Sequence, residues 1–161
     1  MKHNLRAIVC GSRDSLTSAD INHVIATLNA IQARLAHYDA RISVVIEGGA
    51  AGIDSIASKW GRSASFVSVK TFRADWKSHG KAAGPIRNST MLQEGQPHFV
   101  IAFPGGKGTA NMVALARKAG VHVVDLVAAD CAIDHLVDEL AAKLQLPESP
   151  ATPDFPVAWA H

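Results

Sequence analysis

Short apolar runs alternate along this chain with segments of helical periodicity, and this alternation constrains the fold more than any other feature. Five runs rich in β-branched residues end in polar or glycine-containing loops, at residues 5–10, 42–46, 66–72, 99–103 and 121–127. Apolar residues recur with a helical period in the segments between and after them, most clearly from Thr17 to Leu35 and from 133 to 144. Such alternation is typical of parallel sheets with right-handed crossovers. The sequence therefore predicts an α/β fold, a doubly wound, mainly parallel sheet of about five or more strands flanked by helices.

Length and composition predict a single domain. The chain has 161 residues, of which 48% are hydrophobic and 19% are charged, and this is enough to build one core. We assign the domain to residues 1–146. The remaining segment, 147–161, contains four prolines, so we expect an extended or disordered tail.

The distribution of charged, cysteine and histidine residues excludes several classes of protein. The 16 basic and 14 acidic residues are interspersed, so no basic tail or stripe indicates a nucleic-acid surface. Cys10, Cys131 and the eight histidines lack metal-ligand spacing, and we predict neither a metal nor a cofactor. The first apolar run is too short for a signal peptide or a membrane span. We therefore expect a cytoplasmic protein with no membrane partner.

The unusual residues of the chain all follow predicted strands, at the edge where open α/β sheets bind ligands. Gly11-Ser12-Arg13 follows the first strand, and residues 47–54 follow the second. A long polar segment that reaches Arg87-Asn88 follows the third, and residues 104–109 follow the fourth. The candidate ligand-binding residues are Gly11, Ser12, Arg13, Gly48, Gly49, Gly52, Asn88, Pro104, Gly105, Gly106, Lys107, Gly108 and Thr109.

The two glycine clusters in these loops indicate phosphate binding. Glycine permits a positive φ and close backbone approach, which leaves amide N–H groups and a helix dipole to receive an anion. The alternative is that both clusters are only tight turns. Neither has the spacing of a P-loop or of a dinucleotide-binding fingerprint, so ATPase and dehydrogenase functions are excluded. Arg13 and Arg87 would add donors if they point inward, whereas an exposed side chain is the alternative for both and for Lys107.

Three residues in these loops are candidates for catalysis. Arg87 could bind the phosphate or the leaving base. Glu47 ends the second strand and could act as a base or bind a sugar hydroxyl, with a salt bridge at the sheet edge as the alternative. Asp54 could contact a ribose hydroxyl or only cap its helix. We expect Trp60 and Trp76 to serve in core or lid packing rather than in base stacking.

Taken in order, the motifs GSR at 11–13, EGGAxGxD at 47–54, ADW at 74–76, GxxAGxxRNxxM at 80–91 and PGGxGT at 104–109 resemble one family. They are similar to the YspA-like, cpYpsA-related branch of the SLOG superfamily, over about residues 5–126. More distantly the chain resembles the Lonely-guy phosphoribohydrolases, which cleave nucleoside 5′-monophosphates, and the single-stranded DNA-binding fold of DprA. The resemblance implies a Rossmann-like sheet, a phosphate on the PGGxGT loop and a homodimer.

The resemblance to the hydrolases fails at one position. In that family an arginine and the glutamate of PGGxGTxxE carry the reaction, and the matching residues here are Arg87 and Met112. A thioether can neither stabilise an oxocarbenium ion nor activate water. Either Glu47 or Asp54 takes the role of the missing glutamate, or the protein binds its ligand without cutting it.

These observations lead to two main hypotheses of different classes. We favour a binding module or sensor for a nucleotide or nucleotide-derived ligand, and the alternative is a nucleoside 5′-monophosphate hydrolase that releases base and ribose 5-phosphate. Single-stranded DNA binding comes third, because the aromatic residues and lysine stripe of such grooves are missing. We expect a homodimer through apolar helix faces at 112–116 and 133–144, which could equally be ordinary core.

Overall fold

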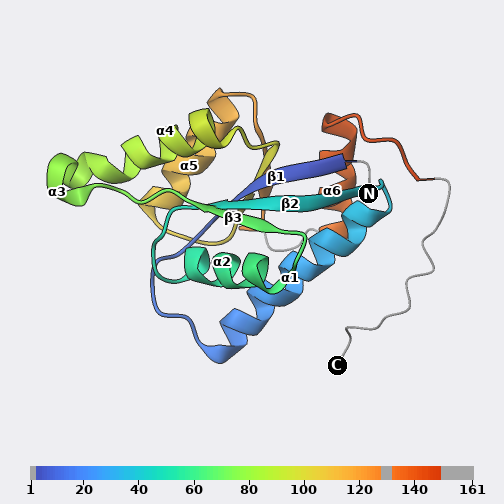
Figure 1. The fold of residues 1–161 in the computed structure, drawn as a ribbon, viewed down its shortest axis with the longest axis horizontal. Coiled ribbons are helices and arrows are strands. Elements are labelled where there is room, and N and C mark those ends of the chain that lie inside the picture. The colour runs from blue at the N-terminus through green and yellow to red at the C-terminus, as the bar shows by residue number, and fades with distance from the viewer. Residues whose placement is uncertain (1–2, 128–131, 150–161) are drawn as a thin grey trace.

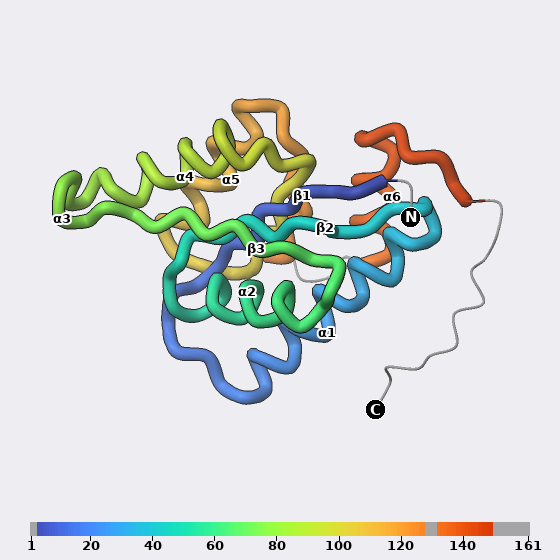
Figure 2. The backbone as a smooth tube through the Cα atoms, in the orientation of Figure 1, coloured from blue at the N-terminus to red at the C-terminus, as the bar shows by residue number. Residues whose placement is uncertain are grey.

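The computed structural model describes residues 3–127 and 132–149 and contains a five-stranded parallel sheet (Figures 1 and 2). Its strands are β1 (His3–Cys10), β2 (Ala40–Glu47), β3 (Ser68–Thr71), β4 (Phe99–Ala102) and β5 (His122–Asp125). All neighbouring strands are parallel, in the order β3-β2-β1-β4-β5. The predicted α/β fold is confirmed. The strand order reverses between β1 and β4, and such a switch point leaves a crevice at the carboxyl ends of these strands.

Helices cover both faces of the sheet, as Figure 1 shows. On one face lie α1 (Ser18–Ala36), α2 (Ile53–Ser63) and α6 (Ile133–Lys143), whose buried residues share one core cluster. On the other face lie α4 (Ala83–Gly95) and α5 (Lys107–Lys118), which pack against a second cluster. Because side chains alternate along a strand, Ile8 belongs to the second cluster while its neighbours Ala7 and Val9 belong to the first.

The segment after β3 differs most from expectation. We assigned no helix there, but it contains α3 (Trp76–His79), a 3₁₀ turn (Gly80–Ala82) and the whole of α4. Asp75 begins this segment by accepting a hydrogen bond from Ser78 N–H at 3.0 Å. Figure 1 places α3 at the outer end of an arm that extends away from the sheet. Strand β3 is also shorter than the predicted run of 66–72.

The C-terminal segment is described only as far as Ser149, whose backbone N–H donates to the carbonyl of His37 at 2.8 Å. Leu144 and Leu146 still pack against the first core cluster. The rest of the predicted tail, residues 150–161, lies outside the described residues, as does Cys131. Within the described residues, no helix combines the length and the apolar character needed to cross a membrane.

Candidate functional site

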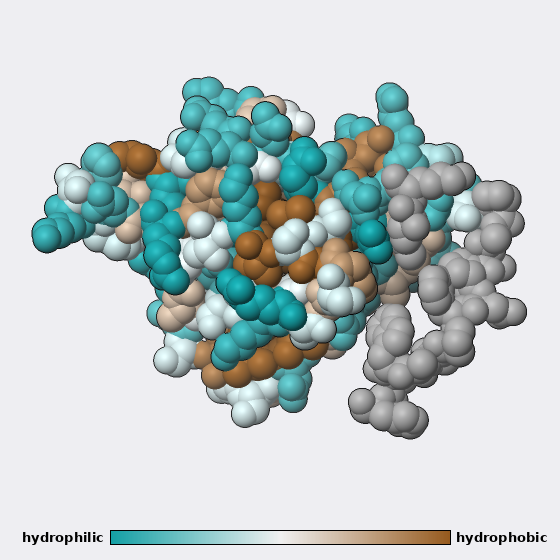
Figure 3. Space-filling model, in the orientation of Figure 1, coloured by the Kyte–Doolittle hydropathy of each residue, from teal (hydrophilic) through white to brown (hydrophobic). Residues whose placement is uncertain are grey.

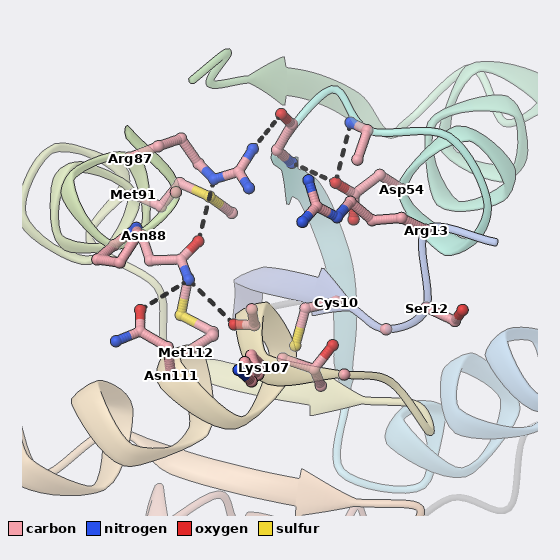
Figure 4. A pocket seen from close by; sticks show the side chains of 18 of the residues that line it. Cys10, Ser12, Arg13, Asp54, Arg87, Asn88, Met91, Lys107, Asn111 and Met112 are labelled. Atoms are coloured by element: carbon pink, nitrogen blue, oxygen red, sulfur yellow. Dashed lines mark hydrogen bonds between the residues drawn. The ribbon is translucent and has the colours of Figure 1, made fainter. Parts of the chain in front are cut away.

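A cavity of about 500 Å³ lies at the carboxyl ends of the central strands, where the strand order reverses (Figure 4). Most of the predicted site residues line it: Gly11, Ser12, Arg13, Gly48, Asp54, Arg87, Asn88, Gly106, Lys107, Gly108 and Thr109. Gly49 lines only an adjoining hollow, while Glu47, Gly52, Pro104 and Gly105 line neither. The topology therefore brings four segments distant in sequence to one place.

The loop after β1 joins the two glycine loops. Ser12 donates its backbone N–H to the carbonyl of Pro104 and accepts at its own carbonyl from Ile53 N–H, each at 3.0 Å. Gly11 leaves no room for a side chain, because a Cβ would lie 2.6 Å from Cγ1 of Ile53. Gly52 has a φ of +73°, and a Cβ at this position would collide with the Ser12 carbonyl oxygen. These glycines are required by the packing of the loops.

The first glycine loop already binds carboxylates of the chain itself. Gly48 and Ala50 donate their backbone N–H groups to Oδ2 of Asp54 at 3.2 and 3.1 Å. Gly49 donates to Oε2 of Glu47 at 2.6 Å, and the other oxygen of Glu47 accepts from the Thr71 hydroxyl. We expected both glycine clusters to offer amides to an anion. In this loop the three amides are occupied, and Glu47 fixes the loop to β3.

The second glycine loop is arranged differently. A Cβ on Gly106 or Gly108 would meet no protein atom within 4 Å, and neither residue has a positive φ. No side chain caps α5, and its first turn contains no acidic residue. Because the first N–H groups of a helix lack intrahelical partners, the start of α5 presents unpaired donors to the cavity. The fold does not require glycine at 106 or 108, and open space at both positions lets a ligand approach the backbone.

Arg87 and Asn88 lie on α4, not on the loop that we expected, and they connect the two glycine loops (Figure 4). Arg87 donates to the carbonyl of Gly48 and, through Nε, to Oδ1 of Asn88 at 3.0 Å. A Cβ on Gly48 would collide with this guanidinium group. Asn88 is buried and donates Nδ2 to the Gly108 carbonyl at 3.1 Å and to Asn111 at 3.0 Å.

Two ionisable groups at the cavity have strongly shifted pKa values. Burial raises the pKa of Asp54 to about 6, and the charge of Glu47 adds to this effect, while the bonds from Ala50 and Gly48 and the charge of Arg87 oppose it. Burial also raises the pKa of the Cys10 thiol to about 12, with further contributions from Asp54 and Asp125. Cys10 therefore stays protonated at neutral pH, whereas Asp54 can gain or lose a proton in the physiological range.

The rim of the cavity carries a cation over an aromatic ring. The Arg13 guanidinium lies 5.3 Å from the centroid of the Trp76 ring, and Trp76 is 47% exposed. We expected Trp76 to pack in a core or lid, and it lies at the rim. Trp60 is buried as expected, and its indole N–H donates to Asn29 at 2.8 Å. Sequence reasoning missed Lys81, Met91 and Asn111 as lining residues. Lys81 and Met91 lie beside and on the unpredicted α4, whereas Asn111 lies on α5.

Met112 lines the cavity from α5 and is 1% exposed. It packs in the second core cluster with Ile8, Met91 and Val100. The position that carries the glutamate in the hydrolases is therefore an apolar wall here. Among residues 3–127 and 132–149, no group of three or more histidine, cysteine, aspartate or glutamate side chains could hold a metal ion.

Comparison with known proteins identifies the family. A family model described as the YspA, cpYpsA-related SLOG family (YAcAr) matches residues 5–79, which include the first glycine loop and Trp76. The Gene 61 protein of Mycobacterium phage D29 is 42% identical over 88 residues, 51% of this chain and 70% of that protein. The X-ray structure of TM1055, a Northeast Structural Genomics Consortium target, has a TM-score of 0.54 at 18% identity, over 74% of this chain and 72% of that one, and shows the fold. The chain belongs to the YspA, cpYpsA-related SLOG family.

Proposed function

We propose that this protein binds a nucleotide or nucleotide-derived molecule through a phosphate group at the start of α5, and that it acts as a sensor or binding module. The SLOG family and the Rossmann-like fold fit a nucleotide-related binding role. The observation that carries the proposal is the contrast between the two glycine loops. The amides at 48–50 are occupied by Asp54 and Glu47, whereas the start of α5 is uncapped and opens onto the cavity through Gly106 and Gly108.

Charge and size support an anionic small molecule. Among the described residues, four basic side chains line the cavity, those of Arg13, Lys81, Arg87 and Lys107, against the two carboxylates of Asp14 and Asp54. A volume of about 500 Å³ falls within the usual range for small-molecule sites. The buried hydroxyl of Thr109 is a further donor beside the α5 amides. A phosphate at this place would combine helix-terminus amides with charge-assisted bonds from arginine.

Replacement of Gly108 by alanine tests this proposal sharply. The residue is helical and a Cβ there meets no protein atom within 4 Å outside its own turn, so Gly108→Ala should fold without loss of stability. The same methyl group blocks the approach of a ligand to the α5 amides. We expect titration calorimetry to show binding of ribonucleoside 5′-monophosphates but not nucleosides to the wild type, and at least tenfold weaker binding to the variant.

Lys118→Ala, in the last turn of α5, is the matched control and should leave binding unchanged. Equal affinity of the wild type and Gly108→Ala for every nucleotide that binds would rule out a phosphate at the start of α5. So would equal affinity for nucleosides and their monophosphates.

Hydrolysis of nucleoside 5′-monophosphates is the second candidate, and one observation favours it. Asp54 lies at the cavity and has a pKa of about 6, and the charge of Arg87 acts on it. A general acid or base requires such a pKa near the working pH. The apolar wall at Met112 argues for binding without cleavage. Chromatography of each bound nucleotide after incubation separates the two candidates. Released base that disappears in Asp54→Asn would establish the hydrolase.

We further propose that the protein is cytoplasmic, and that it consists of a domain at 1–146 and a tail at 147–161. We also propose that it forms a homodimer. The dimer rests on the resemblance alone, because Met112, Ala116, Val137 and Leu140 of the expected apolar faces are buried within the monomer. Figure 3 shows hydrophobic residues gathered in the middle of another face, between the α4 and α2 layers. Light scattering at tens of micromolar protein tests the assembly.

A further inference from the structure

A second hollow, of about 310 Å³, adjoins the cavity and extends toward the β3 side of the site. The two share Arg13, Trp76 and Arg87, and only the second reaches Arg73 and Gly49. Three guanidinium groups therefore line the second hollow, and no carboxylate lines it. Figure 4 shows Arg13 and Arg87 directed into the same space from opposite sides.

None of these three arginines has an ionic partner within the described residues. The ion pairs found there join Arg34 to Asp138, Arg117 to Asp125 and His135 to Glu139. Burial lowers the pKa of Arg87, and the charge of Arg13 adds to this effect, while the charges of Asp54 and Glu47 oppose it. Like charges close to a partly desolvated space repel each other, and an anion between them removes this cost.

Backbone and ring contacts hold the three side chains at the hollow. Arg87 is tied to the carbonyls of Gly48 and, at 3.5 Å, of Phe72. Arg73 donates Nη1 to the Gly49 carbonyl at 3.4 Å, and Gly49 has a φ of +71° that brings its backbone under this side chain. The Trp76 ring supports Arg13. A guanidinium group has five N–H donors, so each arginine keeps donors available to a ligand.

We propose that this second hollow is an anion subsite and that the ligand carries a second phosphoryl group in addition to the one at α5. The class of ligand is a nucleotide with two phosphoryl groups, either a nucleoside diphosphate or a nucleoside 3′,5′-bisphosphate. This inference rests on the proposed function, since Arg87 lies between the two positions and lines both hollows. Arg73 lines only the second hollow, so a substitution of Arg73 tests the second phosphoryl position separately from the one at α5.

The test is titration calorimetry at fixed salt concentration with the 5′-monophosphates, 5′-diphosphates and 3′,5′-bisphosphates of the four ribonucleosides. We expect the second phosphoryl group to raise affinity for the wild type about tenfold, as one arginine–phosphoryl contact does. In Arg73→Gln this gain should be lost, while monophosphate affinity stays within about twofold of the wild type. The matched control is Arg62→Gln, because the Arg62 guanidinium bonds only Ser58 among the described residues and should keep the gain.

Thermal unfolding verifies that Arg73→Gln folds, as its exposed side chain and single long hydrogen bond lead us to expect. If monophosphates bind and no second phosphoryl group improves affinity, the inference fails while the proposed function stands. A gain that persists in Arg73→Gln also overturns the inference. If none of these nucleotides binds, the proposed function fails and the second subsite fails with it.

Discussion

Two carboxylates seven residues apart occupy opposite sides of the first glycine loop, and only one faces the cavity. Glu47 is 2% exposed and has both oxygens engaged, by Gly49 and by Thr71. Asp54 uses one oxygen, Oδ2, for the backbone N–H groups of Gly48 and Ala50. The sequence offers both as candidate catalytic groups, but a base or a ribose ligand needs access to the substrate. Of the two carboxylates, Asp54 is therefore the one that a ligand in the cavity could contact.

The raised pKa of Asp54 predicts a particular dependence of stability on pH. The folded state holds this proton more tightly than the unfolded state, whose pKa is 3.8. The free energy of unfolding contributed by Asp54 is therefore fully present below pH 4 and is lost as pH rises to about 6, by about 3 kcal/mol in total. Asp54→Asn keeps an oxygen for the loop amides, so its stability should not fall over this range.

Urea unfolding from pH 4.5 to 7.5 measures this difference, with Asp14→Asn as the control for an exposed carboxylate at the same cavity. Protonation of Asp54 also removes a negative charge near the ligand, so phosphate affinity of the wild type should rise relative to that of Asp54→Asn as pH falls through about 6. The phosphate group itself gains a proton over the same range in both proteins, and the comparison cancels this effect. Parallel pH profiles for the wild type and Asp54→Asn would contradict the raised pKa.

Glycine marks the site in the sequence, but the reason for each glycine emerges only in three dimensions. The clusters at 48–52 and 105–108 both predict an anion site, and only the second leaves its amides open. The difference arises because Asp54 folds back onto its own loop, where it takes the place that a ligand anion could fill. The sequence did not predict where the Arg87 side chain points, because its hydrogen-bond partner Gly48 lies 39 residues earlier in the chain.

Strands and helices differed in how far the sequence could predict them. The three runs that form the central strands β1, β2 and β4 gave strands close to the expected limits, because continuous β-branched residues are typical of parallel strands covered on both faces. The runs at 66–72 and 121–127 gave the two edge strands, β3 and β5, and both strands are shorter than expected. Helix α4 was missed for a physical reason. Its first turn contains Gly84 and Pro85, and few apolar residues follow, so its helical period is weak. Proline is compatible with a first turn, where the N–H has no helical partner, and packing against α5 stabilises the rest.

One buried amide side chain adds hydrogen bonds to the packing of α4 against α5. Asn88 donates to the Gly108 carbonyl and to Asn111, and it accepts from Nε of Arg87. Replacement by leucine removes all three of these partly buried hydrogen bonds, so we expect Asn88→Leu to lose about 1–3 kcal/mol of stability. Because Arg87 also loses one of its three hydrogen bonds, phosphate affinity should fall in the variant as well. Urea unfolding and calorimetry with inorganic phosphate measure the two effects.

Thr90→Ala is the matched control on the same helix, since among the described residues the Thr90 hydroxyl bonds only the Ile86 carbonyl of its own helix. It should leave phosphate affinity unchanged and alter stability by no more than about 0.5 kcal/mol. Normal phosphate affinity in Asn88→Leu would mean that Arg87 does not need its hydrogen bond to Asn88, and that α4 is held to the site by packing alone.

At the scale of the whole molecule, the strand order explains why the site forms where it does. With β1 in the centre of the sheet, the loops after β1, β2 and β4 meet at one edge, and the arm formed by α3 and α4 extends past this edge along one side. Backbone hydrogen bonds of Ser12 already join the loop after β1 to the other two. A ligand at this edge would contact segments from both halves of the sheet, so its binding energy would stabilise the molecule as a unit.

Ligand binding should therefore raise the temperature of unfolding of the whole domain in one transition. A ligand at 100 times its dissociation constant adds about 2.7 kcal/mol, which corresponds to a rise of about 5–10 °C for a domain of this size. Differential scanning calorimetry with a saturating nucleotide measures the shift. Gly108→Ala should show little of it, because its added methyl group blocks the approach of the ligand to the α5 amides. Because the contacts span β1, β2, β4 and α4, the transition should stay single and become no broader. If the ligand shifts only part of the transition, its contacts lie on one half of the sheet. This result would contradict a site that is shared by the loops on both sides of β1.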